Sequence, residues 1–231
     1  MNQFFMLFLK NKSRFLLGPG LILSSFWIYQ IIGQNLLVGI LVFFITLLFL
    51  YKPEKKIVFV GMTILLLLQF QTTQIKNLTY LDNDQQRVQQ ERIRSYPPTF
   101  INLLVKVIWL KPQIWIEQNP VILVLSRVEE NLFDTLDINK YFFSGFPRNN
   151  PSDFPKFSFL FLPFFVIGVF GLVNKGNYKQ LMFLFLIPLI LFSVIGKDNK
   201  FGPFSLFPFF ILTIHSGFNL VKNNLKTLLK K

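Results

Sequence analysis

The chain has 231 residues, of which 52% are hydrophobic and only 15% are charged, and its formal net charge is +13. An ordinary soluble protein carries roughly 25% charged residues, and here the apolar residues gather in long runs. The basic residues lie in short segments that connect those runs, which argues against the basic stripe of a nucleic-acid-binding surface. We therefore predict an all-α membrane protein and no nucleic-acid partner.

Six apolar stretches come close to the roughly 20 residues that a helix needs to cross a bilayer. They are residues 15–33, 35–51, 57–73, 157–173, 180–196 and 201–221. The third stretch is the weakest, because Gln69, Gln71 and Gln74 make its C-terminal end less hydrophobic. Those amides could lie at the headgroup level or face another helix. The chain divides accordingly into regions 1–74, 75–156 and 157–231, with three spans in the first and three in the last.

The basic residues of the short loops predict the orientation of these spans. Lysines and arginines gather before the first span, between the second and third, between the fourth and fifth, and after the sixth. The opposite side has the uncharged turn 33–35 and the loop 197–200, in which one aspartate partly offsets two lysines. Because basic loops stay inside, we predict a multi-pass protein of the cell membrane with both termini cytoplasmic. Region 75–156 is then extracytoplasmic.

The outer region has the composition of helices joined by proline-containing turns. The polar run 82–95 is rich in helix formers, with an aspartate at its start and Tyr96 and two prolines after its end. Residues 98–110 place apolar residues at helical spacing and include Lys106, so we expect a short helix in the membrane interface. Asn119 and Pro120 resemble an N-cap and first helical position, opening a helix to about residue 136. Turn residues then predict a loop over 137–155.

The sequence carries few groups suited to catalysis or metal binding. It has no cysteine and one histidine, His215, which lies in the sixth span and which we interpret as satisfied by a neighbouring helix. No phosphate-binding glycine loop, dinucleotide fingerprint, zinc-protease motif or nucleophile elbow occurs. Glu130 and Asp134 share a helix face and could pair as acid and base or bind a cation, although a solvated face is the simpler interpretation. We predict no metal site and no cofactor.

Arginine is concentrated in the outer region. The guanidinium group suits bidentate phosphate binding, so several arginines near a membrane surface could hold a lipid phosphate or pyrophosphate head group. Pairing with nearby acids is the alternative. The candidates for lipid-phosphate binding are Arg92, Arg94, Arg127 and Arg148.

The segment 136–173 resembles part of the polytopic GT-C glycosyltransferases of the protein-mannosyltransferase and aminoarabinose-transferase type. An extracytoplasmic helix there leads into a pattern of aromatic residues, glycine, proline and arginine, followed by a span that begins leucine-proline-phenylalanine. The residues that follow this pattern are Asp137, Tyr141, Phe142, Phe143, Gly145, Pro147, Arg148, Leu162, Pro163, Phe164, Phe165 and Gly168, and in the last span Leu206, Phe207, Pro208 and Phe209.

The resemblance implies a membrane protein that uses a polyprenyl-phosphate sugar as donor and acts in cell-envelope glycosylation. Enzymes of this type hold their catalytic carboxylate in the first outer loop, which here is only the turn 33–35 without a carboxylate. The chain thus looks like the C-terminal half of such an enzyme: a shortened relative, or a companion to a second membrane chain, with no catalytic residue assigned. The alternatives are a small transporter or channel subunit with inverted halves, and a scaffold whose outer segment binds a partner.

Overall fold

Helices make up most of the computed structural model, which describes residues 17–73, 78–81, 83–95, 99–103, 106–110, 112–143, 155–174, 178–196 and 201–228. A first helical piece covers residues 17–23. The further helices are α2 Phe26–Gln34, α3 Leu36–Tyr51, α4 Lys55–Thr72, α5 Asn83–Ser95, α6 Pro112–Gln118, α7 Pro120–Leu136, α8 Asn139–Phe142, α9 Leu162–Asn174, α10 Tyr178–Ile195 and α11 Phe207–Leu228, with 3-10 turns η1 Phe159–Phe161 and η2 Phe204–Leu206.

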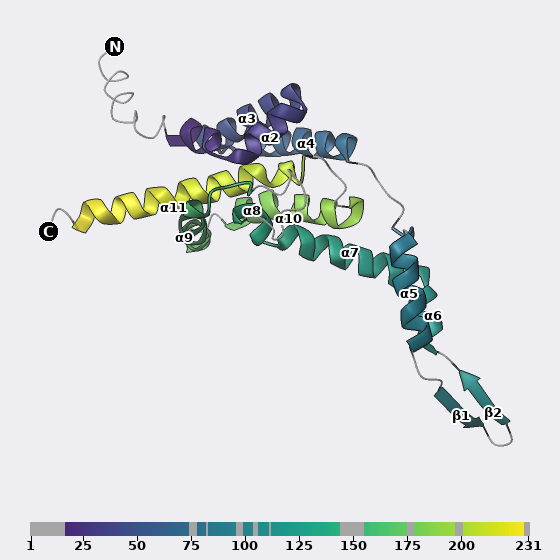
Figure 1. The fold of residues 1–231 in the computed structure, drawn as a ribbon. Helices are drawn as coiled ribbons and strands as arrows, with labels where there is room; N and C mark the ends of the chain where they lie inside the picture. The colour runs from purple at the N-terminus through teal and green to yellow at the C-terminus, as the bar shows by residue number, and fades with distance from the viewer. Residues whose placement is uncertain are drawn as a thin grey trace, which may run out of the picture.

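The helices form a body from which an arm extends. Helices α2, α3 and α4 lie on one side of α11, and α7, α9 and α10 lie on the other side (Figure 1). The arm consists of α5, α6 and an antiparallel hairpin of β1 Thr99–Leu103 and β2 Lys106–Leu110, in which Ile101 pairs with Ile108. Helix α7 joins the two parts, because it packs against α10 in the body and against α6 in the arm.

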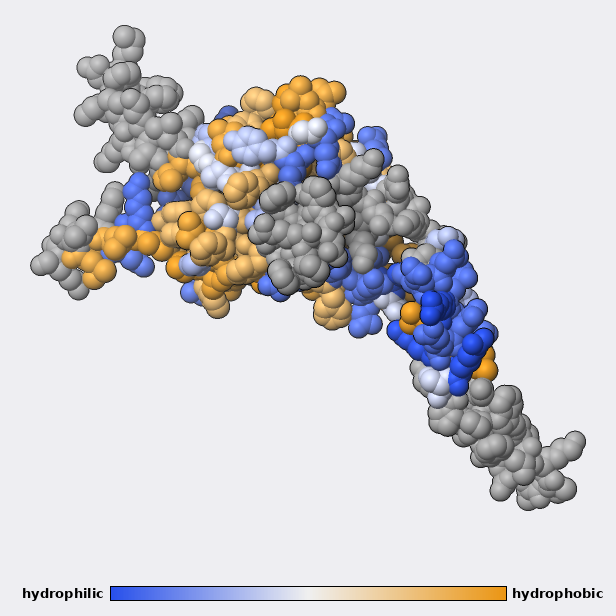
Figure 2. Space-filling model, in the orientation of Figure 1, coloured by the Kyte–Doolittle hydropathy of each residue, from blue (hydrophilic) through white to orange (hydrophobic). Residues whose placement is uncertain are grey.

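Hydrophobic surface covers much of the body, whereas hydrophilic surface gathers on the arm over α5 (Figure 2). Helix α3 buries one face through Val42 and Phe49, yet it exposes Phe44 and Leu48 on the other. Large apolar side chains are likewise exposed on α4 and α10. Helices that are apolar on all sides are typical of a core or of a membrane environment.

Two helical segments are long and apolar enough to cross a membrane, Lys55–Thr72 and Phe204–Leu225. The first corresponds to the third predicted span and the second to the sixth. Three shorter apolar helices, Leu36–Tyr51, Phe159–Asn174 and Met182–Ile195, fall within the second, fourth and fifth predicted spans.

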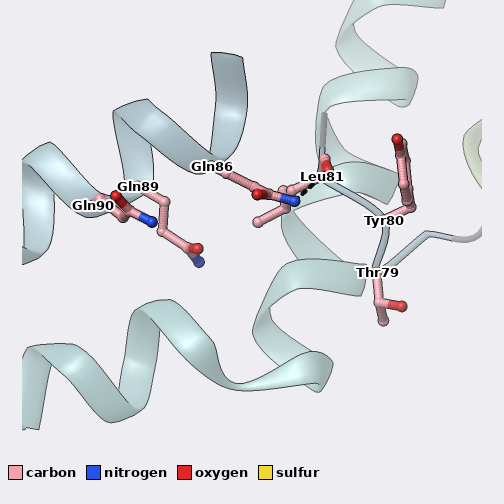
Figure 3. Close-up of a pocket in the computed structure, with 6 residues that line it drawn as sticks. All are labelled: Thr79, Tyr80, Leu81, Gln86, Gln89 and Gln90. Atoms are coloured by element: carbon pink, nitrogen blue, oxygen red, sulfur yellow. Dashed lines mark hydrogen bonds between the residues drawn. The ribbon is translucent and has the colours of Figure 1, made fainter. Parts of the chain in front are cut away.

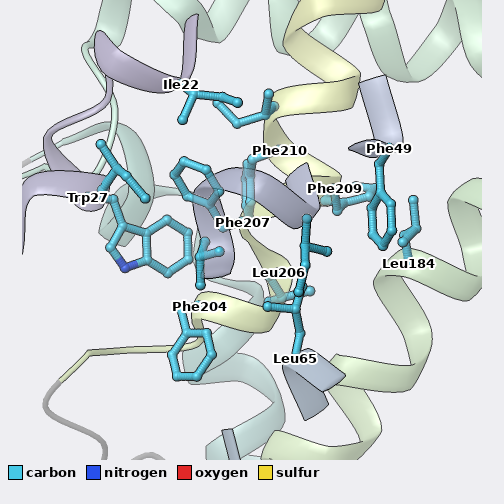
Figure 4. Packing of buried hydrophobic residues seen from close by; sticks show 14 of the residues in the cluster. Ile22, Trp27, Phe49, Leu65, Leu184, Phe204, Leu206, Phe207, Phe209 and Phe210 are labelled. Atoms are coloured by element: carbon cyan, nitrogen blue, oxygen red, sulfur yellow. The ribbon is translucent and has the colours of Figure 1, made fainter. Parts of the chain in front are cut away.

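An aromatic cluster fills the core where α2, α8 and the start of α11 meet (Figure 4). The indole of Trp27 is fully buried, and ring centroids of Tyr141, Phe157 and Phe207 lie 5.6–5.9 Å from it. Tilted and edge-on pairs at such separations are favourable beyond the apolar area that they bury. The indole nitrogen donates a 2.9 Å hydrogen bond to the carbonyl of Phe201. Trp27 therefore joins segments that are distant in the sequence.

Helices α9 and α11 cross with their backbones in contact, and glycines make this possible. A Cβ atom on Gly168 would lie 1.9 Å from the carbonyl oxygen of Thr213, and a Cβ on Gly217 would lie 1.9 Å from that of Phe164. Close approach of helices through small residues is the usual packing mode in membranes, where van der Waals contact drives helix association.

The amide of Gln69 is buried and anchors the turn that leads into α11. Its nitrogen donates to the Gly202 carbonyl at 3.2 Å, and its oxygen accepts from the Ser205 amide at 3.1 Å. Gly202 adopts a positive φ of 66°, which favours glycine. Of the two interpretations of the amides in the third predicted span, Gln69 fits the one in which a side chain faces another part of the protein.

Three predicted elements differ from the structure. The first apolar stretch is two helical pieces, because the hydroxyls of Ser24 and Ser25 donate to backbone carbonyls of the preceding turn and Ser25 caps α2. Residues 99–103 and 106–110 form the two strands of the hairpin where a helix over 98–110 was predicted, since they are rich in the β-branched and aromatic residues that favour strands. The predicted loop 137–155 contains the short helix α8.

Several predictions concern residues outside the described ranges. They include the basic residues before the first span, the loop 197–200, the last lysines of the tail and the segment 144–154 with Arg148.

Candidate functional site

The arm brings two of the predicted arginines to one groove, which we call the arginine groove. It is a hollow of about 400 Å³ between α5, α6 and α7. Arg92 and Arg127 line it, together with the carboxylates of Asp84 and Glu130. Its apolar lining comes from Leu81, Val88, Ile116, Ile122 and Leu123. The groove thus combines charged groups of both signs with an apolar wall, and the four charges among its described lining residues balance.

Arg127 is held in place by neighbours from its own helix and from α5. Its guanidinium group donates to Glu130 at 3.0 Å, to the side-chain oxygen of Gln85, and to the Tyr80 carbonyl at 3.4 Å. Pairing with nearby acids, which the sequence offered as the alternative to phosphate binding, is therefore present. A phosphate would have to share this guanidinium with Glu130.

Two other predicted arginines, Arg92 and Arg94, do not take part in these contacts of Arg127. Arg92 and Arg94 are exposed in the last turn of α5, where cations are favourable near the negative end of the helix dipole. Arg94 does not line the groove.

A second hollow on the arm is lined by glutamines. It measures about 490 Å³ and lies between α5 and the chain before it, with Thr79, Tyr80, Gln89 and Gln90 on its walls (Figure 3). The Gln86 side chain donates to the Leu81 carbonyl at 3.0 Å and so closes one side. This hollow has hydrogen-bonding groups but no charged lining residue.

The two carboxylates predicted as an acid and base pair contact different cations. Glu130 pairs with Arg127, and Asp134 pairs with Lys140. Among the residues that the structure describes, no group of three or more histidines and carboxylates could hold a metal ion. His215 approaches Asn219 one turn later in α11, at 3.3 Å from its ring nitrogens. That contact lies within one helix, and the interpretation that a neighbouring helix satisfies His215 stays a prediction.

A third hollow, which we call the lysine pocket, lies at the end of the body near α8. It measures about 190 Å³, and its lining residues are Asp134, Thr135, Lys140, Tyr141, Lys156, Phe192, Gly202 and Pro203. The backbone on both sides of the Lys156 side chain is fixed: its carbonyl accepts from Trp27 at 3.0 Å, and the next amide, of Phe157, donates to the Tyr141 carbonyl at 2.8 Å.

The ammonium group of Lys156 lies between two aromatic rings. Its Nζ is 4.6 Å from the ring centroid of Trp27 and 4.5 Å from that of Tyr141, within the range of cation–π attraction. The pKa of Lys156 is lowered to about 7, chiefly by burial and also by the nearby Lys140 charge, while Asp134 opposes the shift. Burial also raises the pKa of the Tyr141 hydroxyl, which donates to the Thr135 carbonyl at 2.9 Å.

Lys156 was not among the site residues predicted from the sequence. The available signal was a single lysine placed directly between Pro155 and the apolar run that starts at Phe157. A lysine in that place was easily taken as the ordinary charge that flanks a span.

Comparison with protein-family models, curated proteins and solved structures finds no match to this chain. The expected GT-C resemblance therefore depends on the sequence patterns alone.

Proposed function

We propose that the chain is a multi-pass membrane protein of the cell envelope, with its arm outside the cytoplasm. The observation that supports this is the exposure of large apolar side chains on the outer faces of the body helices. On α10 the exposed residues follow one another at every fourth position, as Met182, Leu186, Ile190 and Val194. Lipid would cover such a stripe, whereas water would not favour it.

The absence of cysteine allows a direct test of this topology. Ser95, exposed at the end of α5, and Lys52, exposed between α3 and α4, are each replaced by cysteine. We expect a membrane-impermeant maleimide to label Ser95→Cys in intact cells and to label Lys52→Cys only after the membrane is opened. Equal labelling of both variants in intact cells would contradict the proposed orientation.

We further propose that the protein is a companion in polyprenyl-phosphate-dependent glycosyl transfer. The arginine groove supports this proposal, because it offers guanidinium groups beside an apolar wall and so matches a phosphate attached to a hydrocarbon chain. Among the described residues no carboxylate partner is recorded for Arg92, which leaves its charge available to such a head group.

Binding of undecaprenyl phosphate to the purified protein tests the companion proposal. We expect Arg92→Gln with Arg127→Gln to weaken binding by at least about tenfold, since each removes a charge-assisted hydrogen bond. Arg94→Gln is the matched control, because it removes a charge from the same helix outside the groove. Undecaprenol without phosphate should bind all three proteins alike. Equal binding of the phosphate form to the double variant and to the control would exclude the groove.

The alternative of a transporter with inverted halves has less support. In the C-terminal half, the first and third helices cross at Gly168 and Gly217. In the N-terminal half the closest pair is instead α2 and α3, where a Cβ on Gly39 would lie 2.4 Å from the Ile32 side chain. Inverted repeats pair equivalent helices in the same way, and this difference argues against the transporter hypothesis.

A further inference from the structure

The lysine pocket is separate from the arginine groove and has a different chemistry. It lies where Asp134 and Thr135 of α7 meet Lys140 and Tyr141 of α8, and Gly202 closes it from the turn before α11. The charged groups among its described lining residues are two ammoniums and one carboxylate. When both lysines are protonated, these described groups therefore carry one net positive charge.

The net positive charge lies on Lys156, because the carboxylate of Asp134 forms its ion pair with Lys140. Asp134 pairs with Lys140, while the recorded contacts of the Lys156 ammonium are the ring faces of Trp27 and Tyr141. Ring faces stabilise a cation less than a carboxylate does when water is excluded. Asp134 acts on Lys156 electrostatically but is ion-paired with Lys140. A partly buried ammonium whose described carboxylate is shared in this way is costly, and an anion in the adjoining hollow would lower that cost.

The pocket is open next to this ammonium because residue 202 is glycine. A Cβ atom at that position would lie 3.1 Å from the Nζ of Lys156, and the backbone there has a φ of 66°. A side chain at residue 202 would therefore narrow the space beside the cation.

We propose that the lysine pocket binds a singly charged phosphate group, such as the phosphodiester of an anionic phospholipid or of a soluble ester. One negative charge balances the pocket, and the phosphate oxygens can accept from Lys140 and Lys156. The Lys156 backbone is already fixed by Trp27 and Tyr141, so little ordering is required on binding. This site does not depend on the arginine groove.

Binding is coupled to the protonation of Lys156. Its pKa is about 7, so below pH 7 the ammonium is formed and affinity is at its highest. Above pH 7 a proton must be taken up on binding, and affinity falls by up to about tenfold per pH unit. Among the described residues, the charged groups that act on this amine are Lys140 and Asp134, and the ring of Tyr141 faces it. Asp137 acts in turn on the Tyr141 hydroxyl.

The test measures the acetylation rate of the Lys156 amine by peptide mass spectrometry. The full chain is held in dodecyl maltoside, which contains no phosphate. Phosphatidylglycerol or dimethyl phosphate is added, with diacylglycerol as the phosphate-free control.

We expect protection of Lys156 that weakens as the pH rises through 7. Protection by phosphatidylglycerol alone identifies a lipid head group as the ligand, and equal protection by dimethyl phosphate identifies the phosphate group itself. Protection by neither compound overturns the proposal.

The test also uses a variant of an exposed pocket residue, because such a change should leave the folded structure intact. Lys140 is about half exposed, and Lys140→Gln should raise the half-protecting concentration at least about tenfold. Lys52→Gln, on an exposed loop of the body, is the matched control and should leave it unchanged. Equal shifts in both variants would overturn the site. Arg92→Gln with Arg127→Gln should not affect Lys156, so failure of one proposal is distinguishable from failure of the other.

Discussion

Replacing Gly168 with alanine is expected to destabilise the protein by about 3 kcal/mol or more. The added Cβ would lie 1.9 Å from the Thr213 carbonyl oxygen and 2.8 Å from its carbon. These are backbone atoms, so the contact can be relieved only by moving α9 away from α11. Unfolding in mixed micelles of a mild detergent and sodium dodecyl sulfate, followed by circular dichroism, measures the change in free energy.

Gly33→Ala is the matched control for this experiment. Gly33 lies inside α2, and nothing lies within 4 Å of a Cβ built there. Because alanine favours a helix over glycine by about 1 kcal/mol, this variant should be as stable as the wild type or more so. If Gly168→Ala unfolded at the same detergent composition as Gly33→Ala, the close crossing of α9 and α11 would be wrong.

Trp27→Ala is expected to cost about 3–5 kcal/mol, the range for truncating a large buried aromatic side chain. The indole is 0% exposed, and its loss would leave a cavity among the surrounding rings. The hydrogen bond that the indole nitrogen donates to the Phe201 carbonyl would also be lost. The same detergent titration measures the loss, and a smaller effect is expected for Trp27→Phe, which keeps part of the ring contact.

Trp115→Ala provides the comparison at a residue of the same type. Trp115 lies on α6 and is 69% exposed, so its truncation should change the free energy of unfolding by less than about 0.5 kcal/mol. Similar losses for Trp27→Ala and Trp115→Ala would contradict the aromatic cluster as the centre of the core.

Local rules predicted those elements whose ends are set by neighbouring residues. The Asn119 side chain accepts from the Val121 amide, Pro120 occupies the first turn, and α7 ends at Leu136 as expected. Asn35 is the only non-helical residue between α2 and α3, and its side chain caps α3. In each case a short polar side chain satisfies amides at a helix start, and this signal lies within a few residues of the sequence.

The sequence was a poor guide where long-range contacts decide the structure. The break at Ser25 is accompanied by a hydrogen bond from the Trp27 amide to the distant Lys156 carbonyl. The strands 99–103 and 106–110 lie where a helix was predicted, because a short apolar run fits both the helical and the strand periodicity. The lysine pocket draws residues from α7, α8, α10 and two connecting segments, so no local pattern could reveal it.

For the candidate site residues, too, local sequence predicted some features, whereas long-range contacts decided the others. Arg92 and Arg127 do share a groove, but the carboxylates that balance them could not be assigned from spacing alone. Glu130 and Asp134 are one helical turn apart as expected. Their cation partners lie on different helices, because Arg127 belongs to α7 and Lys140 belongs to α8.

Helix α7 carries parts of both proposed sites. Arg127 and Glu130 line the arginine groove, and Asp134 and Thr135 line the lysine pocket on the next turns. The Asn131 side chain between them donates to the Ser193 carbonyl of α10 at 3.3 Å and ties this rod to the body. A rigid sliding of α7 along α10 would change both hollows at once. Because one helix lines both hollows, the distance between them is set by the length of α7 from Arg127 to Asp134.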